Sequence, residues 1–264
     1  MSVLLSSLFL LALLCASAAV GFFVRSRLRE EHISKDGIEL LQLVIGLLVT
    51  FAALVLGLLT ASVKSAYDNA SHDRGQYAAR LAQLDRCMRN YGAGSEPTRA
   101  QLASYTAAVI ASTWPSEARP QGVTVPDVST MARTGENPVL AGLMNEIGLE
   151  IHQWKPADAL HEKLAADCAQ QFGDVMKARW AVIEEAHGSI SAPFYWILVF
   201  WLMVVFASFG LRTPRNALVL IVIGLCAVSV SSAIFVILDM DQPYGGLFGV
   251  SSESMRNALK DMLR

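Results

Sequence analysis

The sequence predicts an all-α integral membrane protein with four spans and a large helical extramembrane domain between spans two and three. Only 17% of its 264 residues are charged and 53% are hydrophobic, whereas a soluble chain of this length would carry about 25% charged residues. The deficit is confined to four windows that lack Asp, Glu, Lys and Arg. Each window is longer than the stretch of about 20 residues with which a helix crosses a bilayer. These windows are residues 1–24, 40–63, 186–211 and 216–238.

This distribution excludes a soluble enzyme and a secreted disulfide scaffold. It also excludes a nucleic-acid-binding domain, because the net charge is only -2. The lipid bilayer is therefore the first partner that the sequence predicts.

The first span, at about 3–24, is interpreted as an uncleaved helix. Ala16-Ser17-Ala18 resembles a cleavage site, but a signal peptide begins with basic residues and here the first one, Arg25, follows the apolar stretch. The remaining spans are predicted at about 40–63, 193–211 and 217–238. Spans three and four are joined by a short loop and form a hairpin.

The short loops decide the predicted orientation, because basic residues in short loops favour the cytoplasm. The loop after span one carries Arg25, Arg27, Arg29 and Lys35, and the loop after span three carries Arg212 and Arg215. Both termini and the domain at 64–192 are then expected in the periplasm, with the protein in a bacterial inner membrane. The opposite orientation, with a cytoplasmic domain, remains the alternative.

Residues 64–192 carry 12 Lys and Arg and 15 Asp and Glu, so they predict a water-exposed domain. Apolar residues at helical spacing continue from span two to Tyr91, where Gly92 ends the pattern. Further helices are expected after Ser95, from Leu140 and from about Asp158 to Gly188. Four prolines make 114–138 a loop.

Cys87 and Cys168 are predicted to come close to each other. Cys87 lies 23 residues after Lys64, and Cys168 lies 25 residues before Pro193. In straight antiparallel helices, both would sit roughly 35 to 38 Å from the same membrane surface. They form a disulfide if the domain faces an oxidising compartment, and otherwise they are two small buried apolar residues.

No enzyme is predicted. His161-Glu162 begins like a zinc-protease helix, but Ala165 stands where the second histidine ligand would be. The sequence contains no nucleophile elbow or phosphate-binding loop, so we expect no catalytic residue, metal site or cofactor.

Span two carries a stripe of small and polar residues, spaced three or four apart so that they share one helix face. A stripe of this kind does not suit lipid. On the residues alone, a helix-packing seam is favoured over a pore wall in an oligomer. The stripe consists of Gln42, Gly46, Thr50, Ala53, Gly57 and Thr60.

The C-terminal region, 239–264, is predicted to turn at the membrane edge and end in a short amphipathic helix. Asp239 and Asp241 follow span four, but two carboxylates do not fill a cation site. The turn residues are Pro243, Gly245 and Gly246, Ser252 is the expected N-cap, and the apolar stripe of the helix is Met255, Leu259 and Leu263.

The chain resembles the bestrophin-like membrane domain family of unknown function, which is bacterial and distantly similar to bestrophin anion channels. The resemblance is carried by Leu84-Asp85-Arg86, Tyr91-Gly92, Trp201, Phe209-Gly210, the tail from Leu238-Asp239 to Gly246, and Val250-Ser251. It implies a homo-oligomer that conducts anions, with span two lining the pore. It also implies that the large domain is cytoplasmic, whereas the basic residues in the short loops predict that it is periplasmic. The alternative function is a non-conducting structural or sensory protein whose extramembrane domain binds a partner.

Overall fold

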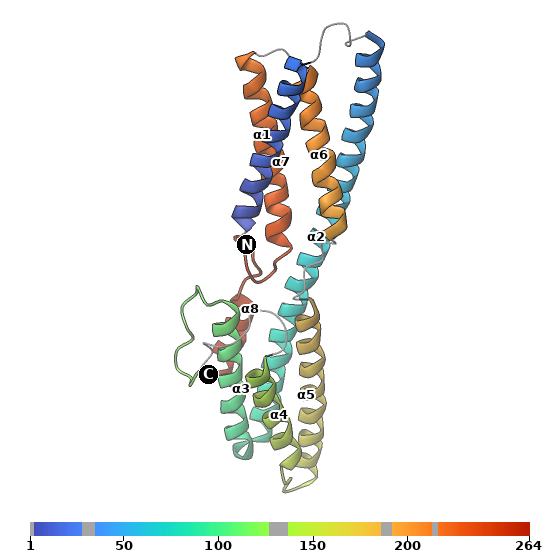
Figure 1. The fold of residues 1–264 in the computed structure, drawn as a ribbon. Coiled ribbons are helices and arrows are strands. Elements are labelled where there is room, and N and C mark those ends of the chain that lie inside the picture. Colours follow the sequence, from blue (N-terminus) through green and yellow to red (C-terminus); the bar gives the residue numbers. More distant parts are fainter. Residues whose placement is uncertain (1–2, 28–34, 127–136, 186–191, 213–215) are drawn as a thin grey trace. The chain divides into compact units, whose positions relative to one another are not determined.

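The computed structural model describes residues 3–27, 35–126, 137–185, 192–212 and 216–264, and every regular element within them is helical (Figure 1). Arg29, Arg215, Gly188 and residues 127–136 of the predicted loop lie outside the described residues. The helices are α1 (Val3–Arg27), α2 (Lys35–Tyr91), the 3-10 turn η2 (Ala93–Ser95), α3 (Glu96–Thr113), α4 (Pro138–Gln153), α5 (Ala159–Glu185), α6 (Ala192–Arg212), α7 (Ala217–Met240) and α8 (Glu253–Met262).

These helices form two compact units. The first unit comprises Met1–Ser65 and Ser189–Asp241, and the second comprises Ala66–Gly188 and Gln242–Arg264. Helix α2 contributes its first part to one unit and its second part to the other. The second unit thus includes the C-terminal residues from Gln242 to Arg264.

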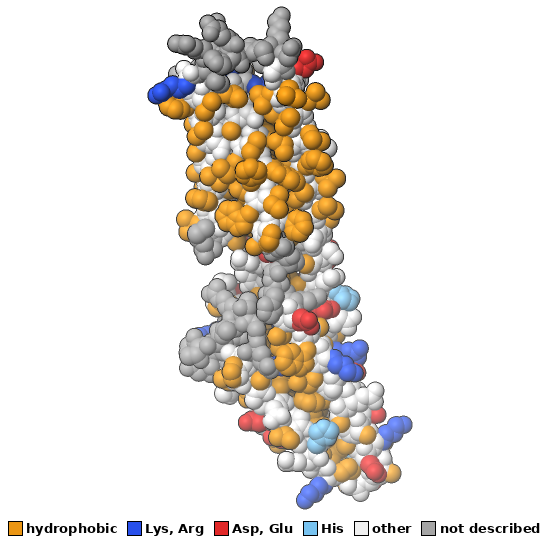
Figure 2. Space-filling model, turned by 45° about the vertical axis from the view of Figure 1, so that its right-hand side comes forward, with side chains coloured by type: hydrophobic (Ala, Val, Ile, Leu, Met, Phe, Trp, Pro, Cys, Tyr) orange, Lys and Arg blue, Asp and Glu red, His pale blue; other side chains and the backbone are white. Residues whose placement is uncertain are grey.

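The first unit is a bundle of α1, α6, α7 and the first part of α2. All four of these helices are long and apolar enough to cross a membrane. Their exposed side chains are mainly hydrophobic, as Figure 2 shows for one face of this unit. Its core includes Leu10, Leu14, Leu198, Phe206 and Ala227.

Helices α1 and α6 cross in backbone contact. A Cβ added to Gly21 would overlap the carbonyl oxygen of Ala207, and a Cβ added to Gly210 would overlap that of Ala18. Only glycine allows this approach, which is the usual way in which helices pack closely inside a membrane.

The second unit is a bundle of the second part of α2 with α3, α4, α5 and α8. Helix α2 runs without a break to Tyr91, as the spacing predicted, and Gly92 ends it with a φ of 97° that favours glycine. The bundle buries a continuous apolar core, whose largest members include Tyr77, Leu81, Leu84, Met88, Leu102, Tyr105, Ile110, Met144 and Ile147.

The predicted apolar stripe of the last helix is partly wrong. Helix α8 buries Met255, Ala258, Leu259 and Met262, whereas Leu263 is 46% exposed. Leu263 lies just beyond the last helical residue, so it does not continue the buried face.

Ser252 is the N-cap residue of this helix, as predicted, but its side chain makes no capping hydrogen bond. Its hydroxyl instead donates to Glu117 at 2.5 Å, while Ser251 accepts a hydrogen bond from the Glu253 backbone N–H at 3.1 Å. A neighbouring serine therefore satisfies an amide at the helix start.

Candidate functional site

The small and polar stripe of α2 lies on the open surface of the first unit. All six of its residues, from Gln42 to Thr60, are exposed. The buried residues of this part of α2 are Ile45, Ala52 and Val63. On a helix that turns 100° per residue, the stripe is centred about 100° away from this packed face. Within this chain, the stripe therefore lies beside the packed face and not in it.

The glycines of the stripe confirm this distinction. A Cβ added to Gly46 or Gly57 would meet no atom within 4 Å, in contrast to Gly21 and Gly210 at the crossing of α1 and α6. The α2 glycines therefore leave space at the surface of the first unit and do not bring two helices of this chain together.

The polar groups of the stripe are partly engaged within the first unit. The hydroxyls of Thr50 and Thr60 donate to the carbonyl oxygens of Gly46 and Leu56, at 2.9 and 2.7 Å. Because their donors are used by their own helix, both threonines can accept further hydrogen bonds without leaving a donor unsatisfied. At one end of the stripe, Gln42 accepts a hydrogen bond from Arg212 at 3.1 Å.

Basic residues gather at the same end of the first unit. Arg25, near the end of α1, donates to the carbonyl oxygen of Leu211 near the end of α6 at 3.2 Å. Arg212 follows directly in the chain and reaches Gln42. Arg25 and Arg212, at the ends of α1 and α6, therefore form a cationic rim next to Gln42, while Glu39 near the start of α2 adds a negative charge.

Two cysteines link α2 to α5 in the second unit. The Cα atoms of Cys87 and Cys168 are 5.6 Å apart and their sulfur atoms are bonded. Both residues are buried. Cys15 and Cys226, in the first unit, are free and exposed.

Backbone hydrogen bonds close a turn after α7. The N–H of Gly245 donates to the carbonyl oxygen of Gln242 at 3.0 Å, and the N–H of Val250 donates to that of Pro243 at 2.7 Å. The loop is anchored by the indole of Trp114, which donates to the Val250 carbonyl oxygen at 2.8 Å.

Asp239 is 2% exposed, and among the described residues no group of three or more acidic, histidine or cysteine side chains could hold a metal ion.

A cluster of arginine and aromatic side chains inside the second unit was missed by sequence reasoning. Arg74 and Arg179 are each 4% exposed, and the hydroxyls of Tyr77 and Tyr105 are 2.5 Å apart. Burial raises the pKa of Tyr77 well above its ordinary value, and the contact with Tyr105 raises it further, against the lowering effect of the two arginines. Arg74 lies between Ala70 and Tyr77 in the apolar spacing of α2. A charged residue at a position where the spacing predicts burial was the signal that could have revealed this cluster.

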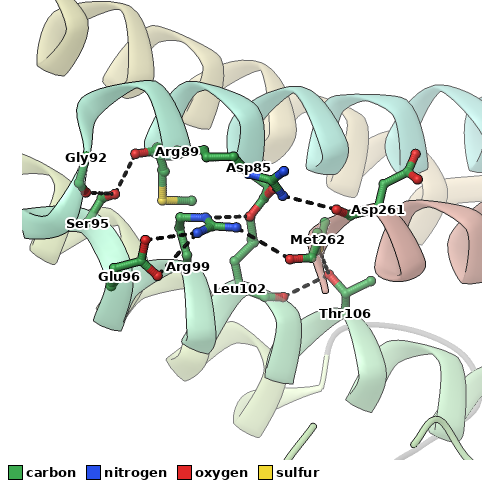
Figure 3. A network of polar contacts seen from close by, with 11 residues as sticks. Asp85, Arg89, Gly92, Ser95, Glu96, Arg99, Leu102, Thr106, Asp261 and Met262 are labelled. Atoms are coloured by element: carbon green, nitrogen blue, oxygen red, sulfur yellow. Dashed lines mark hydrogen bonds and ion pairs between the residues drawn. The ribbon is translucent and has the colours of Figure 1, made fainter. Parts of the chain in front are cut away.

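The Leu84-Asp85-Arg86 motif contributes a buried carboxylate. Asp85 is 3% exposed and accepts hydrogen bonds from Arg89 and Arg99, each at 3.0 Å. Figure 3 shows that the same two arginines reach the end of α8, where Arg89 donates to the carbonyl oxygen of Asp261 and Arg99 to that of Met262, at 3.1 and 3.4 Å. Cations are favourable at a helix C-terminus, so this network holds the C-terminal helix on α2 and α3.

Comparison with known proteins assigns the fold. The bestrophin-like domain family matches residues 12–255. A variant of a bacterial bestrophin homologue from Klebsiella pneumoniae aligns with a TM-score of 0.67 and 14% identity, over 100% of this chain and 97% of that one. A protein described as a membrane protein aligns with a TM-score of 0.63 and 13% identity, over 100% of this chain and 98% of that one. Comparison with curated proteins finds no significant match.

Proposed function

Because this chain belongs to the bestrophin-like family, we propose that it forms a homo-oligomeric channel for anions, with the α2 stripe lining the pore. The observation that carries the proposal is the exposure of the whole stripe in one protomer. Small and polar residues are poorly suited to lipid, and a symmetric ring of protomers would place them around a common axis.

The neighbouring faces of α2 support the same arrangement. One side of the helix packs within the first unit through Ile45, Ala52 and Val63, and Phe51 contacts Trp201 on α6 with the ring centroids 6.1 Å apart. Another side exposes large apolar residues, including Leu43, Leu54 and Leu58. The stripe separates these two sides, as expected of a surface that faces neither the core nor bulk lipid.

We also propose that the second unit lies in the periplasm of a bacterial inner membrane. Two independent observations support this orientation. The cationic rim of the first unit fits the cytoplasmic side, and the bond between Cys87 and Cys168 fits an oxidising compartment. A fusion of alkaline phosphatase after Arg264 should be active in cells, and an inactive but stably inserted fusion would reverse the orientation.

The pore assignment is tested by Thr50→Trp, with Leu54→Trp as the matched control. Both residues are exposed on α2, but only Thr50 belongs to the stripe. Purified variants would be compared in proteoliposomes by chloride efflux, after size-exclusion chromatography has shown that assembly is unchanged. Thr50→Trp should reduce efflux at least tenfold, and Leu54→Trp should conduct like the wild type.

Two outcomes contradict the proposal. Equal efflux from both variants would remove the stripe from the pore. A correctly assembled wild-type protein that conducts no ion would favour the alternative, a non-conducting structural or sensory protein whose helical extramembrane domain binds a partner.

A further inference from the structure

Arg74 occupies an unusual place in the second unit. Its guanidinium carbon is 5.1 Å from the ring centroid of Trp114 and 4.4 Å from that of Tyr244. The two rings are nearly perpendicular, with an interplanar angle of 88°. The cation therefore sits in an aromatic corner, where each ring offers a favourable electrostatic contact.

One donor of the Arg74 guanidinium has no hydrogen-bond acceptor. The Nε atom of Arg74 is buried and has no partner, and no ion pair to Arg74 occurs within the part of the chain that the structure describes. The residue as a whole is only 4% exposed. A charged group removed from water without a counter-charge is strongly destabilising, so buried cations are normally paired.

Two carboxylates of the second unit, those of Glu117 and Asp85, bind other groups. Glu117, three residues after Trp114, accepts hydrogen bonds from Ser252 and from Arg256 at 2.9 Å. Asp85 accepts from two other arginines.

The surroundings of Arg74 add donors and positive charge. The hydroxyl of Tyr244 is buried without a hydrogen-bond partner. Arg179 is a second buried cation, and both arginines act on the hydroxyl of Tyr77. The corner thus combines a buried cation that has an unsatisfied Nε donor with an unsatisfied hydroxyl, and both groups are complementary to an anion.

A cavity lies beside this corner. Trp114 and Tyr244 line a cavity of about 590 Å³ together with Ser116, Glu117 and the loop residues 245–247 and 249–251. Two residues of the corner therefore border an open space, although Arg74 itself does not line it.

We propose that the aromatic corner binds a small monovalent anion, with Arg74 as its charge partner and the Tyr244 hydroxyl as a hydrogen-bond donor. A halide and a small carboxylate such as acetate share the required chemistry. The site lies in the second unit, and it requires neither ion conduction nor the assignment of α2 to a pore. Binding is measured without ion flux, so failure of this inference is distinguishable from failure of the channel.

The test is thermal unfolding of the full chain in detergent, followed by tryptophan fluorescence. Sodium gluconate at constant ionic strength is replaced stepwise by sodium bromide or by sodium acetate. The wild type should show a saturable rise in unfolding temperature with at least one of the two, and the more effective salt identifies the class of anion. In crystals grown with bromide, an anomalous peak should lie beside Arg74 if the site takes halides.

Three variants locate the effect. Arg74→Gln should abolish the saturable rise, and Arg80→Gln, which changes an exposed arginine on the same helix, should retain it. Tyr244→Phe keeps the ring and should weaken binding about tenfold, the usual effect of losing one hydrogen bond to a charged group. If Arg74→Gln does not fold, Tyr244→Phe carries the test.

The proposal is overturned if neither anion gives a saturable effect in the wild type, as would happen if a carboxylate of the chain itself filled the corner. It is also overturned if Tyr244→Phe and Arg74→Gln respond like the wild type.

Discussion

Arg99 donates from Nε to the carboxylate of Asp85 at 3.0 Å, and this carboxylate is almost completely buried, with 5% of the side chain exposed. The Arg99 side chain is itself 14% exposed and also reaches the carbonyl oxygen of Met262. One buried acid thus orients the cation that holds the end of α8.

Replacement of Asp85 by alanine should therefore destabilise the second unit. The change leaves Arg99 without its buried partner, and breaking a buried pair costs roughly 3 kcal/mol. Asp261→Ala is the control, because its ion pair with Arg264 is exposed and worth less than about 1 kcal/mol. Chemical unfolding in detergent and limited proteolysis of the C-terminus measure the two effects, and similar losses in both variants would contradict this role of Asp85.

The glycines of the first unit should respond in opposite ways to a methyl group. Gly21→Ala forces α1 and α6 apart and should cost about 1 to 3 kcal/mol. Gly57→Ala meets no atom in the protomer and replaces a poor helix former, so the free energy of unfolding should stay the same or rise by about 0.5 to 1 kcal/mol. Thermal unfolding compares the variants, and a loss in Gly57→Ala would indicate a tight contact between protomers.

The bond between Cys87 and Cys168 closes a sequence separation of 81 residues. A loop of this length predicts a stabilisation of about 4 kcal/mol in the chain-entropy treatment. The wild type should migrate faster on a non-reducing gel than after reduction, and Cys87→Ser should abolish the difference. Alkylation of both thiols in the native, unreduced protein would show that the bond does not form in the cell.

Tyr77 and Tyr105 should resist ionisation. Burial raises the pKa of both above the ordinary value of 10.0, so the folded state holds their protons where the unfolded chain releases them. The contribution of these two tyrosines to the free energy of unfolding is complete below pH 10 and is lost as the pH rises above 10. Absorbance at 295 nm should show fewer tyrosines ionised at pH 10.5 in the folded protein than after denaturation. Tyr77→Phe should reduce that difference, and an unchanged difference would contradict the assignment.

The helices were predictable because their signals are local. Charge-free windows marked the four apolar helices, and the lack of a breaker before Gly92 predicted the length of α2. Whether the Gln42 to Thr60 stripe faces the core or the surface was not predictable. The spacing shows which residues share a helix face, but it does not show what that face contacts. That depends on residues such as Ala52, which is buried in a cluster with residues of α1, α6 and α7.

In the second unit, contacts between distant segments were equally unpredictable from the sequence. Arg74 disturbs an apolar pattern, but its aromatic corner is built by Trp114 and Tyr244 from two later segments. Asn137 caps α4 by accepting from the N–H groups of Val139 and Leu140, and this cap was readable in the sequence and was missed.

The contact between α1 and α6 can form only after α6 has been synthesised. Gly21 touches the backbone of a helix that begins at Ala192, and Arg25 bonds to a carbonyl 186 residues later. At a synthesis rate of about 5 to 20 residues per second, α1 must wait roughly 10 to 40 s before its partner exists. Helix α1 is thus made long before it can acquire this neighbour, and during that interval its glycine face is open to other helices in the membrane.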